Sequence, residues 1–254
     1  MENRELLIAL NMIPMLGPKR IEAVTQQFER MPEFMRASRK DLMSVSGISG
    51  KLADHILEYR RTVDPVKETQ KAQKMGVTIV TLHEDEYPEQ LKEIYDPPPV
   101  LYVIGDVSVM KNNSVAIVGT RKASVYGKNV ASNLARDLAA LEVNVVSGMA
   151  RGIDTFAHKG AIAAGGPTTA VWGSGIDVIY PPENRVLAKE IAEHGCILSC
   201  FPLGQKPAAG NFPARNRIIS GLSLGVLVVE AAEKSGSLIT ADFALEQGRE
   251  VFAI

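Results

Sequence analysis

The sequence predicts an α/β fold, in which a small helical domain precedes a doubly wound, mostly parallel sheet. From residue 114 onward, short runs of β-branched residues alternate with stretches of helical character. The strand-like runs lack polar alternation, which is typical of parallel strands buried on both faces. Residues 1–63 contain helical stretches only, so we assign 1–63 to the helical domain and 64–254 to the α/β domain.

Helices separated by short breaks are predicted for the first domain. Two of these breaks, Met15–Ile21 and Gly47–Ala53, resemble each other. Both are similar to helix-hairpin-helix turns, in which a Gly-hydrophobic-Gly hairpin brings backbone N–H groups at a helix start close to a DNA phosphate. Each copy keeps only one of the two hairpin glycines, so a structural domain, a protein-docking domain and a DNA clamp all fit. The predicted helices span 5–11, 19–28, 32–37, 40–45 and 51–61.

The next stretch joins a helix over 66–75 to an apolar strand over 77–82. A rigid turn, Asp96–Pro99, then precedes another strand over 100–104. We expect both strands to extend the sheet that follows.

Six strands are predicted for the remainder of the chain. They cover 115–118, 143–146, 169–172, 197–198, 224–229 and 251–254, and helices over 126–141, 153–164, 184–193, 215–220 and 238–247 lie between them. In parallel, doubly wound sheets, ligands bind at the carboxyl ends of the strands.

The composition, 46% hydrophobic and 22% charged, indicates a soluble globular protein. No apolar run approaches the roughly 18 residues of a membrane span, and the N-terminus is too acidic for a signal peptide, so we expect a cytoplasmic protein. The net charge of −1 argues against a broad basic surface, so any polyanion must be held locally. Cys196 and Cys200 are interpreted as buried reduced thiols, and the four histidines show no metal-ligand spacing.

Five strand-end loops carry the residues that predict function, and the topology gathers these loops at one edge of the sheet. In the first loop, Gly119 permits close backbone approach, Ser124 caps the next helix, and Arg121 offers a planar fork of donors that suits phosphate. Arginine or lysine recurs in four of the five loops. We predict a phosphate-binding site made of Gly119, Arg121, Lys122, Ser147, Gly148, Arg151, Gly173, Gly175, Phe212, Arg215, Asn216, Arg217, Lys234, Ser235 and Gly236.

Some of these residues have a second interpretation. Arg151 with Asp154, and Arg217 with Glu230, would form ordinary ion pairs instead of ligand contacts. Phe212 would either stack on a base, an interaction worth about 1–3 kcal/mol, or anchor its loop in the core.

These motifs resemble the DNA-processing protein A (DprA/Smf) family. The resemblance implies an extended Rossmann-like fold with a SAM-like N-terminal domain, and it implies that Gly119, Arg121, Phe212 and the Arg215 segment contact DNA. Pro182 and Ala209 stand where family members often have lysine, and Cys200 where they often have glutamate. Members usually continue beyond 251–254, so we expect a truncated C-terminus. The resemblance rests on Val118–Arg121, Ser147–Asp154, Tyr180–Pro181, Phe212–Ser223 and Lys234–Ala241, with Tyr87–Pro88 and Pro99–Tyr102 upstream.

From the resemblance we expect a single-stranded DNA-binding protein that protects incoming DNA and helps to load RecA during natural transformation, in competent cells, and during DNA recombination. It would act as a cytoplasmic homodimer, with no catalytic residue, cofactor or metal ion.

Two other classes of function remain open. The first is a nucleotide-binding Rossmann enzyme of the phosphoribohydrolase type. The Pro-Gly-Gly-x-Gly-Thr-x-x-Glu signature of that family is absent, and Asp154, Asp177 and Glu230 lack an accompanying nucleophile or histidine. The second is a protein-interaction scaffold whose ligand site has decayed.

Overall fold

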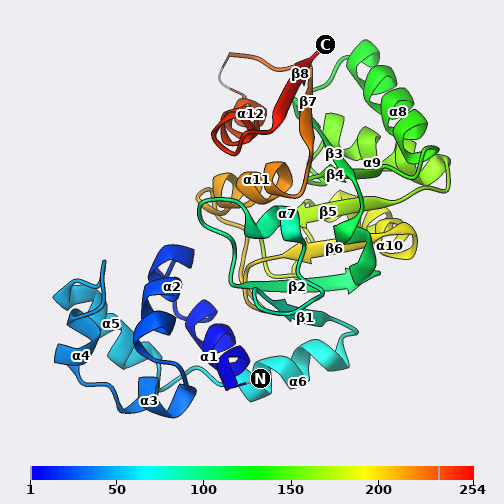
Figure 1. Cartoon of the computed structure of the whole chain (residues 1–254). Helices are drawn as coiled ribbons and strands as arrows, with labels where there is room; N and C mark the ends of the chain where they lie inside the picture. Colours follow the sequence, from blue (N-terminus) through cyan, green and yellow to red (C-terminus); the bar gives the residue numbers. More distant parts are fainter. Residues whose placement is uncertain (1, 234) are drawn as a thin grey trace.

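The computed structural model describes residues 2–233 and 235–254, so the predicted site residue Lys234 lies outside the described residues. A group of short helices lies beside one edge of a larger α/β domain (Figure 1). The five predicted helices are confirmed, with ends that differ by a few residues. We call these five the helical domain: α1 (Glu2–Asn11), α2 (Pro18–Gln27), α3 (Met31–Arg36), α4 (Arg39–Met43) and α5 (Gly50–Tyr59).

The two similar breaks in the helical domain adopt the same backbone conformation. Met15 opens the first turn with a φ of 67°, and Gly47 opens the second with a φ of 77°. Both values lie in the left-handed region, which glycine adopts without a steric penalty and methionine rarely adopts. Ser49 caps α5 with its side chain, whereas Gly17 at the equivalent position of α2 has none to offer. The repeat in the sequence is thus a repeat in the backbone as well, and its first copy places a methionine in the left-handed region.

Eight strands form one sheet in the order β1-β2-β6-β5-β4-β3-β7-β8. The β1–β2 and β2–β6 pairs are antiparallel, and all the other pairs are parallel. Both the mostly parallel, doubly wound sheet and its extension by the two upstream strands are thus confirmed. The strands are β1 (Thr78–Thr81), β2 (Val100–Gly105), β3 (Ser114–Gly119), β4 (Asn144–Ser147), β5 (Thr168–Trp172), β6 (Cys196–Ser199), β7 (Gly225–Val229) and β8 (Glu250–Ala253).

Helices cover both faces of this sheet (Figure 1). Val146 packs on one face with side chains of α11 and α12, whereas its neighbour Val145 packs on the other with α8 and α9. Successive strand residues therefore enter different cores, which explains the missing polar alternation. The helices are α6 (Pro65–Lys74), α7 (Glu89–Lys92), α8 (Val125–Ala139), α9 (Ile153–Ala163), α10 (Arg185–His194), α11 (Asn211–Gly221) and α12 (Gly236–Glu246), with 3-10 helices at Val107–Lys111 and Pro182–Asn184.

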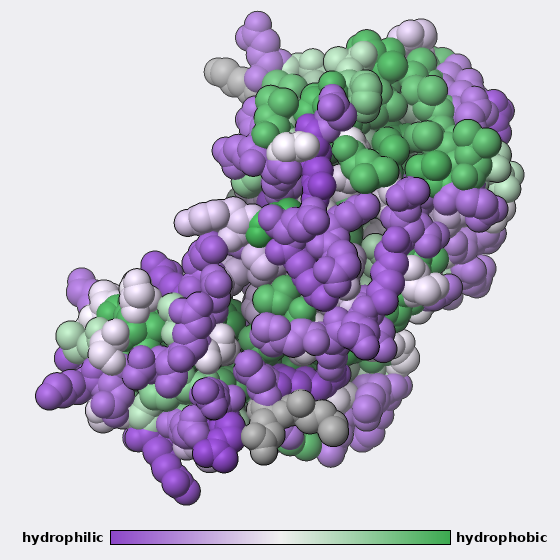
Figure 2. Space-filling view, viewed as in Figure 1, coloured by the Kyte–Doolittle hydropathy of each residue, from purple (hydrophilic) through white to green (hydrophobic). Residues whose placement is uncertain are grey.

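The helical domain shares its core with the sheet. Phe34 and Ile56 of the helical domain belong to the same cluster of buried side chains as Tyr102 of β2 and Trp172 of β5. None of the helices in residues 2–233 and 235–254 has the length and apolar character that a membrane span requires. On the face shown in Figure 2, hydrophilic residues dominate, and apolar residues gather over the region of α8 and α9.

One element was predicted wrongly. Helix α11 begins at Asn211 and not at residue 215, so residues 211–214, which were expected to lie in a strand-end loop, form its first turn. Pro213 suggested a loop, but the first turn of a helix leaves its N–H groups without intrahelical partners, and proline fits there. The short α7 and the two 3-10 helices were not predicted either. Cys196 is buried and Cys200 partly buried, and both are free thiols.

Candidate functional site

A cleft opens at the carboxyl edge of the parallel strands. The strand order reverses between β3 and β7, and the connections from these two strands diverge at that point. Helices α8, α9, α11 and α12 begin at this edge. Their first N–H groups carry partial positive charge, which favours an anion in the cleft.

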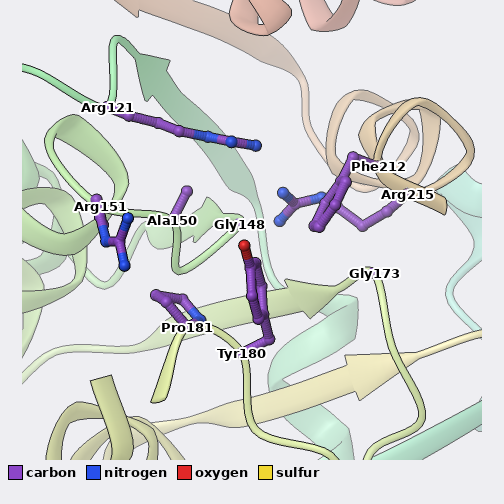
Figure 3. Close-up of a pocket in the computed structure, with 9 residues that line it drawn as sticks. All are labelled: Arg121, Gly148, Ala150, Arg151, Gly173, Tyr180, Pro181, Phe212 and Arg215. Carbon is purple, nitrogen blue, oxygen red and sulfur yellow. The ribbon is translucent and has the colours of Figure 1, made fainter. Parts of the chain in front are cut away.

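The cleft has two adjoining lobes, and Arg121, Ala150, Phe212 and Arg215 line both. The first lobe lies over the ends of β3, β4 and β5 (Figure 3). The second lobe has a volume of about 560 Å³ and lies between α11 and α12. This volume is typical of a small-molecule or nucleotide pocket. The first lobe is completed by Gly148, Arg151, Gly173, Tyr180 and Pro181, and the second by residues that include Gly119, Asp154, Asn216, Ser235, Gly236 and Thr240.

Arg121 is an exposed cation that lines both lobes of the cleft. Its backbone is fixed by the neighbouring Thr120, whose N–H donates to the carbonyl oxygen of Glu230 at 2.8 Å and whose carbonyl accepts from the N–H of Ile153 at 3.2 Å. The guanidinium carbon lies 5.5 Å from the centroid of the Phe212 ring. Within the described residues no carboxylate forms an ion pair with Arg121. This arginine is therefore free to bind an anion.

Arg215 provides a second, buried cation. Its side chain donates from Nη1 to the carbonyl oxygen of Val171 at 2.6 Å, and its Nε has no partner in the described residues. Asp154 lies nearby and accepts from the N–H groups of Gly148 at 3.2 Å and Ala150 at 3.3 Å. Burial lowers the pKa of Arg215 and raises the pKa of Asp154, and the mutual attraction of the two charges opposes both shifts. The floor of the cleft thus holds a positive charge with an unused donor.

Aromatic rings form one wall of the first lobe. The ring centroids of Phe212 and Tyr180 are 5.8 Å apart, with planes inclined by 43°. Phe212 rests on Gly173, where an added Cβ would lie 3.0 Å from the ring. Figure 3 shows Arg121 extending toward Phe212 and Arg215, and the Tyr180 ring lies below these side chains in the view. Tyr180 was missed as a site residue, although the Tyr-Pro pair beyond the β5 loop was the signal that could have found it.

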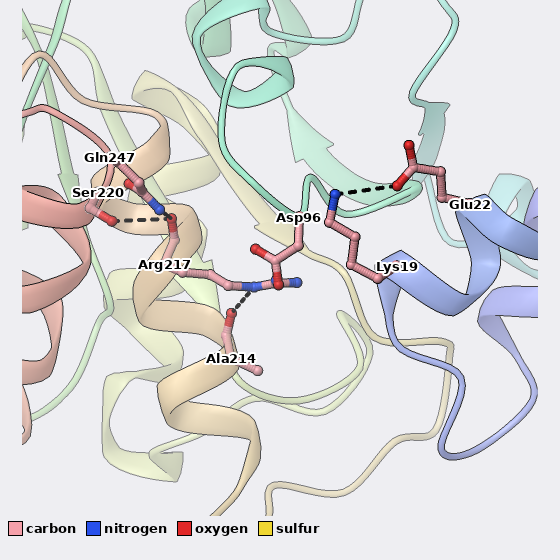
Figure 4. Close-up of polar contacts among 7 residues, drawn as sticks. All are labelled: Lys19, Glu22, Asp96, Ala214, Arg217, Ser220 and Gln247. Atoms are coloured by element: carbon pink, nitrogen blue, oxygen red, sulfur yellow. Dashed lines mark hydrogen bonds and ion pairs between the residues drawn. The ribbon is translucent and has the colours of Figure 1, made fainter. Parts of the chain in front are cut away.

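Two predicted site arginines form ion pairs, with partners other than those considered. Arg151 pairs with Glu183 at the rim of the first lobe, not with Asp154. Arg217 pairs with Asp96, not with Glu230, and its Nε donates to the carbonyl oxygen of Ala214 (Figure 4). Glu230 instead accepts from the N–H and hydroxyl of Ser124, which it holds at the start of α8.

The other predicted residues divide into lining and supporting groups. Asn216 donates to the carbonyl oxygen of Gly236 at 3.1 Å, which joins the two helices around the second lobe. Ser147 is buried beneath the cleft and donates to the carbonyl oxygen of Ile117 at 2.7 Å. Lys122 is exposed beside the cleft. Of the predicted residues that the structure describes, Lys122, Ser147, Gly175 and Arg217 do not line either lobe.

The cleft offers cations and aromatic rings to a ligand. No group of three or more His, Cys, Asp or Glu side chains in the described residues is placed to hold a metal ion. The doubly wound sheet, with cations and aromatic rings at its switch point, defines a Rossmann-like protein with a site for a phosphorylated ligand that has a flat ring.

Comparison with known proteins identifies the family. The family model described as DNA recombination-mediator protein A matches residues 78–254. The chain therefore belongs to the DNA recombination-mediator protein A family, and its resemblance to DprA/Smf proteins is confirmed.

Individual relatives agree with this assignment. Protein Smf of Synechocystis is 39% identical over 251 residues, which cover 97% of this chain and 63% of the relative. The X-ray structure of DNA processing protein A from Streptococcus pneumoniae matches with a TM-score of 0.85 at 36% identity, over 100% of this chain and 87% of that one. A Helicobacter pylori DNA processing protein A, solved for its single-stranded DNA binding mode, matches with a TM-score of 0.64 at 35% identity, over 69% of this chain and 80% of that one. The chain spans about three fifths of the length of the first curated relatives, 63% and 61%.

Proposed function

We propose that the chain binds single-stranded DNA in the two-lobed cleft. The observation that carries the proposal is the exposed, unpaired Arg121 beside the Phe212 and Tyr180 rings. Proteins that bind single strands combine cations for the phosphates with aromatic rings on which bases stack. The structure of the Helicobacter pylori relative, described for its single-stranded DNA binding mode, supports the same ligand class.

The position of the Phe212 and Tyr180 rings in the cleft favours a single strand over a duplex. A base must leave its stack to reach Phe212 and Tyr180, and this costs least when the base is unpaired. Arg121 would hold the adjacent phosphate, and Arg215 would add its positive charge from the floor of the cleft. The positive starts of α11 and α12 would add to the attraction.

A binding role also agrees with how the acidic residues are used. Asp154 accepts backbone N–H groups, Asp177 accepts from the N–H of Gly204 at 2.8 Å, and Glu230 holds Ser124. All three carboxylates considered for acid-base catalysis are thus occupied by hydrogen bonds to the protein itself. We propose a binding protein without catalytic activity.

The wider role that we propose is protection of incoming DNA and loading of RecA in natural transformation, by a cytoplasmic homodimer. Membership of the family supports this role. The apolar surface over α8 and α9 supports self-association, because exposed apolar patches mark protein contacts. In a RecA assembly assay on single-stranded DNA, the protein should accelerate filament formation, and an unchanged rate would contradict the loading role.

The binding proposal is tested by titrating labelled oligonucleotides, single-stranded and duplex, over a range of salt concentrations. We expect tighter binding of single strands and an affinity that falls as salt rises. Arg121→Ala should weaken binding and reduce the slope of log K against log salt by about 0.7, the value for one phosphate contact on a single strand.

Arg136→Ala is the matched control, because Arg136 is an exposed arginine of α8 that pairs with the adjacent Asp137. It should leave the slope unchanged. Equal affinity for the two forms of DNA, or an Arg121→Ala variant that binds as the parent does, would overturn the proposal.

A further inference from the structure

Helix α11 is held from a side that faces away from the cleft. Phe212 and Arg215 line the cleft, whereas Arg217 pairs with Asp96 and is about nine tenths buried (side-chain exposure 10%). The backbone oxygen of Arg217 also accepts from Ser220 at 3.1 Å and from Gln247 at 3.0 Å (Figure 4). Arg217 is therefore an anchor of the helix.

The partner of this anchor stands on a rigid turn. Asp96 is followed by three consecutive prolines, each of which restricts its own φ and the conformation of the residue before it. Tyr87 is completely buried and donates its hydroxyl to the carbonyl oxygen of Pro98 at 2.8 Å. The backbone that follows Asp96 is thus restricted, which limits where its carboxylate can lie.

The segment before this turn also packs against the end of α11. A Cβ added at Gly221 would lie 2.9 Å from side-chain carbons of both Leu91 and Ile94. The last turn of α11 and helix α7 are therefore in close contact, which leaves little freedom to move one without the other.

The same turn reaches the helical domain. Tyr95, next to Asp96, receives Lys19 of α2 over its ring, with Nζ 4.1 Å from the centroid. Lys19 also pairs with Glu22 at 3.4 Å (Figure 4). Residues 95–99 thus lie between the helical domain and α11.

We propose that the 95–99 turn is a strut that sets the position of α11, and that Asp96 is a positioning residue for Phe212 and Arg215 rather than a partner of the ligand. Its effect on DNA binding rests on the proposed function. Arg217, in this view, acts by holding the helix and does not contact DNA. The physical basis is that removing one partner of a buried ion pair leaves an uncompensated charge, which the helix must move to solvate.

The decisive variant is Asp96→Asn, which keeps the side-chain shape and removes its charge. We expect the Kd for single-stranded DNA to rise about tenfold, with an unchanged slope of log K against log salt. Asp85→Asn is the control, because Asp85 is exposed in the same segment and forms no ion pair in the described residues. It should bind as the parent protein does.

The double variant Asp96→Asn/Arg217→Met replaces both charges and should recover much of the lost affinity, because no buried charge remains unpaired. A reduced salt slope in this variant would show that Arg217 contacts a phosphate, and would overturn the inference. An Asp96→Asn variant that binds as tightly as the parent would overturn it as well.

Hydrogen exchange without DNA separates this inference from the proposed function. In Asp96→Asn the amides of α11 should exchange faster than in the parent and in Asp85→Asn. Unchanged exchange in α11 would contradict the strut even if the parent protein bound no DNA. Faster exchange in a protein that binds no DNA would leave the strut standing and reject only the DNA-binding function.

Discussion

The guanidinium of Arg215 lies directly against Gly148, in the space where a side chain at position 148 would begin. This contact lets Arg215 reach across the end of β4 to the carbonyl oxygen of Val171 on β5, at 2.6 Å. The buried cation at the floor of the cleft therefore depends on the absence of a side chain on a neighbouring loop. Glycine is required at position 148 because a side chain would overlap Arg215, and not because of a left-handed backbone conformation.

Gly148→Ala should displace Arg215, because a Cβ at this position would overlap its guanidinium. Forced overpacking of this kind costs about 1–3 kcal/mol of stability, and single-stranded DNA binding should weaken in parallel. Urea unfolding and oligonucleotide titration measure the two effects. Gly210→Ala is the control, since a Cβ there meets nothing within 4 Å. If Gly148→Ala and Gly210→Ala had the same stability and the same DNA affinity, the Arg215 guanidinium would not occupy the space beside Gly148.

Phe212→Leu should weaken binding of single-stranded DNA by about 1–3 kcal/mol, the value of one base stacked on an aromatic ring. Leucine keeps apolar contact with Gly173 but offers no flat face. The control is Phe156→Leu, since Phe156 is a partly buried aromatic residue of α9 with Lys128 and Lys159 over its ring. A Phe212→Leu variant with the affinity of the parent would assign Phe212 to the core.

Glu183→Gln should strengthen DNA binding, because Glu183 competes with phosphate for Arg151. The Arg151 guanidinium holds the pKa of Glu183 below its ordinary value, so the carboxylate is charged at neutral pH. For an exposed pair we expect a gain of about two- to fivefold at low salt, which added salt should reduce. Glu193→Gln, an exposed change of the same charge on α10, distinguishes this local effect from a change in net charge. If Glu183→Gln and Glu193→Gln gained the same DNA affinity, Glu183 would not compete with phosphate for Arg151.

His158 should make the stability of the fold depend on pH. It is completely buried, and its Nδ1 lies 2.7 Å from the hydroxyl of Thr168. Because that hydroxyl donates to the carbonyl of Val145 at 2.8 Å, Nδ1 must be the donor to Thr168, and Nε2 has no partner in the described residues. Burial lowers the pKa of His158 to about 3.

The sign follows from the folded pKa lying below the ordinary value of about 6.5. As pH falls below that value the unfolded chain takes up a proton that the folded chain refuses, so stability is lost down to about pH 3. Between pH 7 and 5 the loss from this residue should be about 2 kcal/mol. His158→Asn, which keeps a donor for Thr168, should lose this part of the pH dependence in urea unfolding. If His158→Asn lost as much stability between pH 7 and pH 5 as the parent does, the folded parent would have to take up the proton on His158, which contradicts the lowered pKa.

The architecture was predictable because its signals are local. Runs such as Val115–Val118 and Leu224–Val229 are apolar and rich in valine without polar alternation, which favours strands buried on both faces. The edge at which the site lies followed from the same pattern, since parallel strands bring their carboxyl ends together. Arg121, Phe212 and Arg215, which were predicted in this way, line the cleft.

Contacts between distant parts of the chain were not predictable. Asp154, three residues further along, was the candidate partner of Arg151, and Glu230 that of Arg217, but Glu183 and Asp96 are the partners. Charge alone does not distinguish among carboxylates until the fold sets their distances. The start of α11 was missed for a different reason, since Pro213 indicates either a loop or the first turn of a helix.

The order of strands in the sheet also determines when the chain can complete its fold during synthesis. β2 ends at Gly105, but β6, against which it pairs, begins only at Cys196. At about 5–20 residues per second, a ribosome needs roughly 5–18 s to make the intervening segment. Over that interval the helical domain and the β1–β2 hairpin have left the ribosome, and one edge of β2 has no strand beside it. An unpaired edge is where chains aggregate, so a chaperone that covers this edge of β2 until β6 emerges should reduce aggregation of the nascent protein.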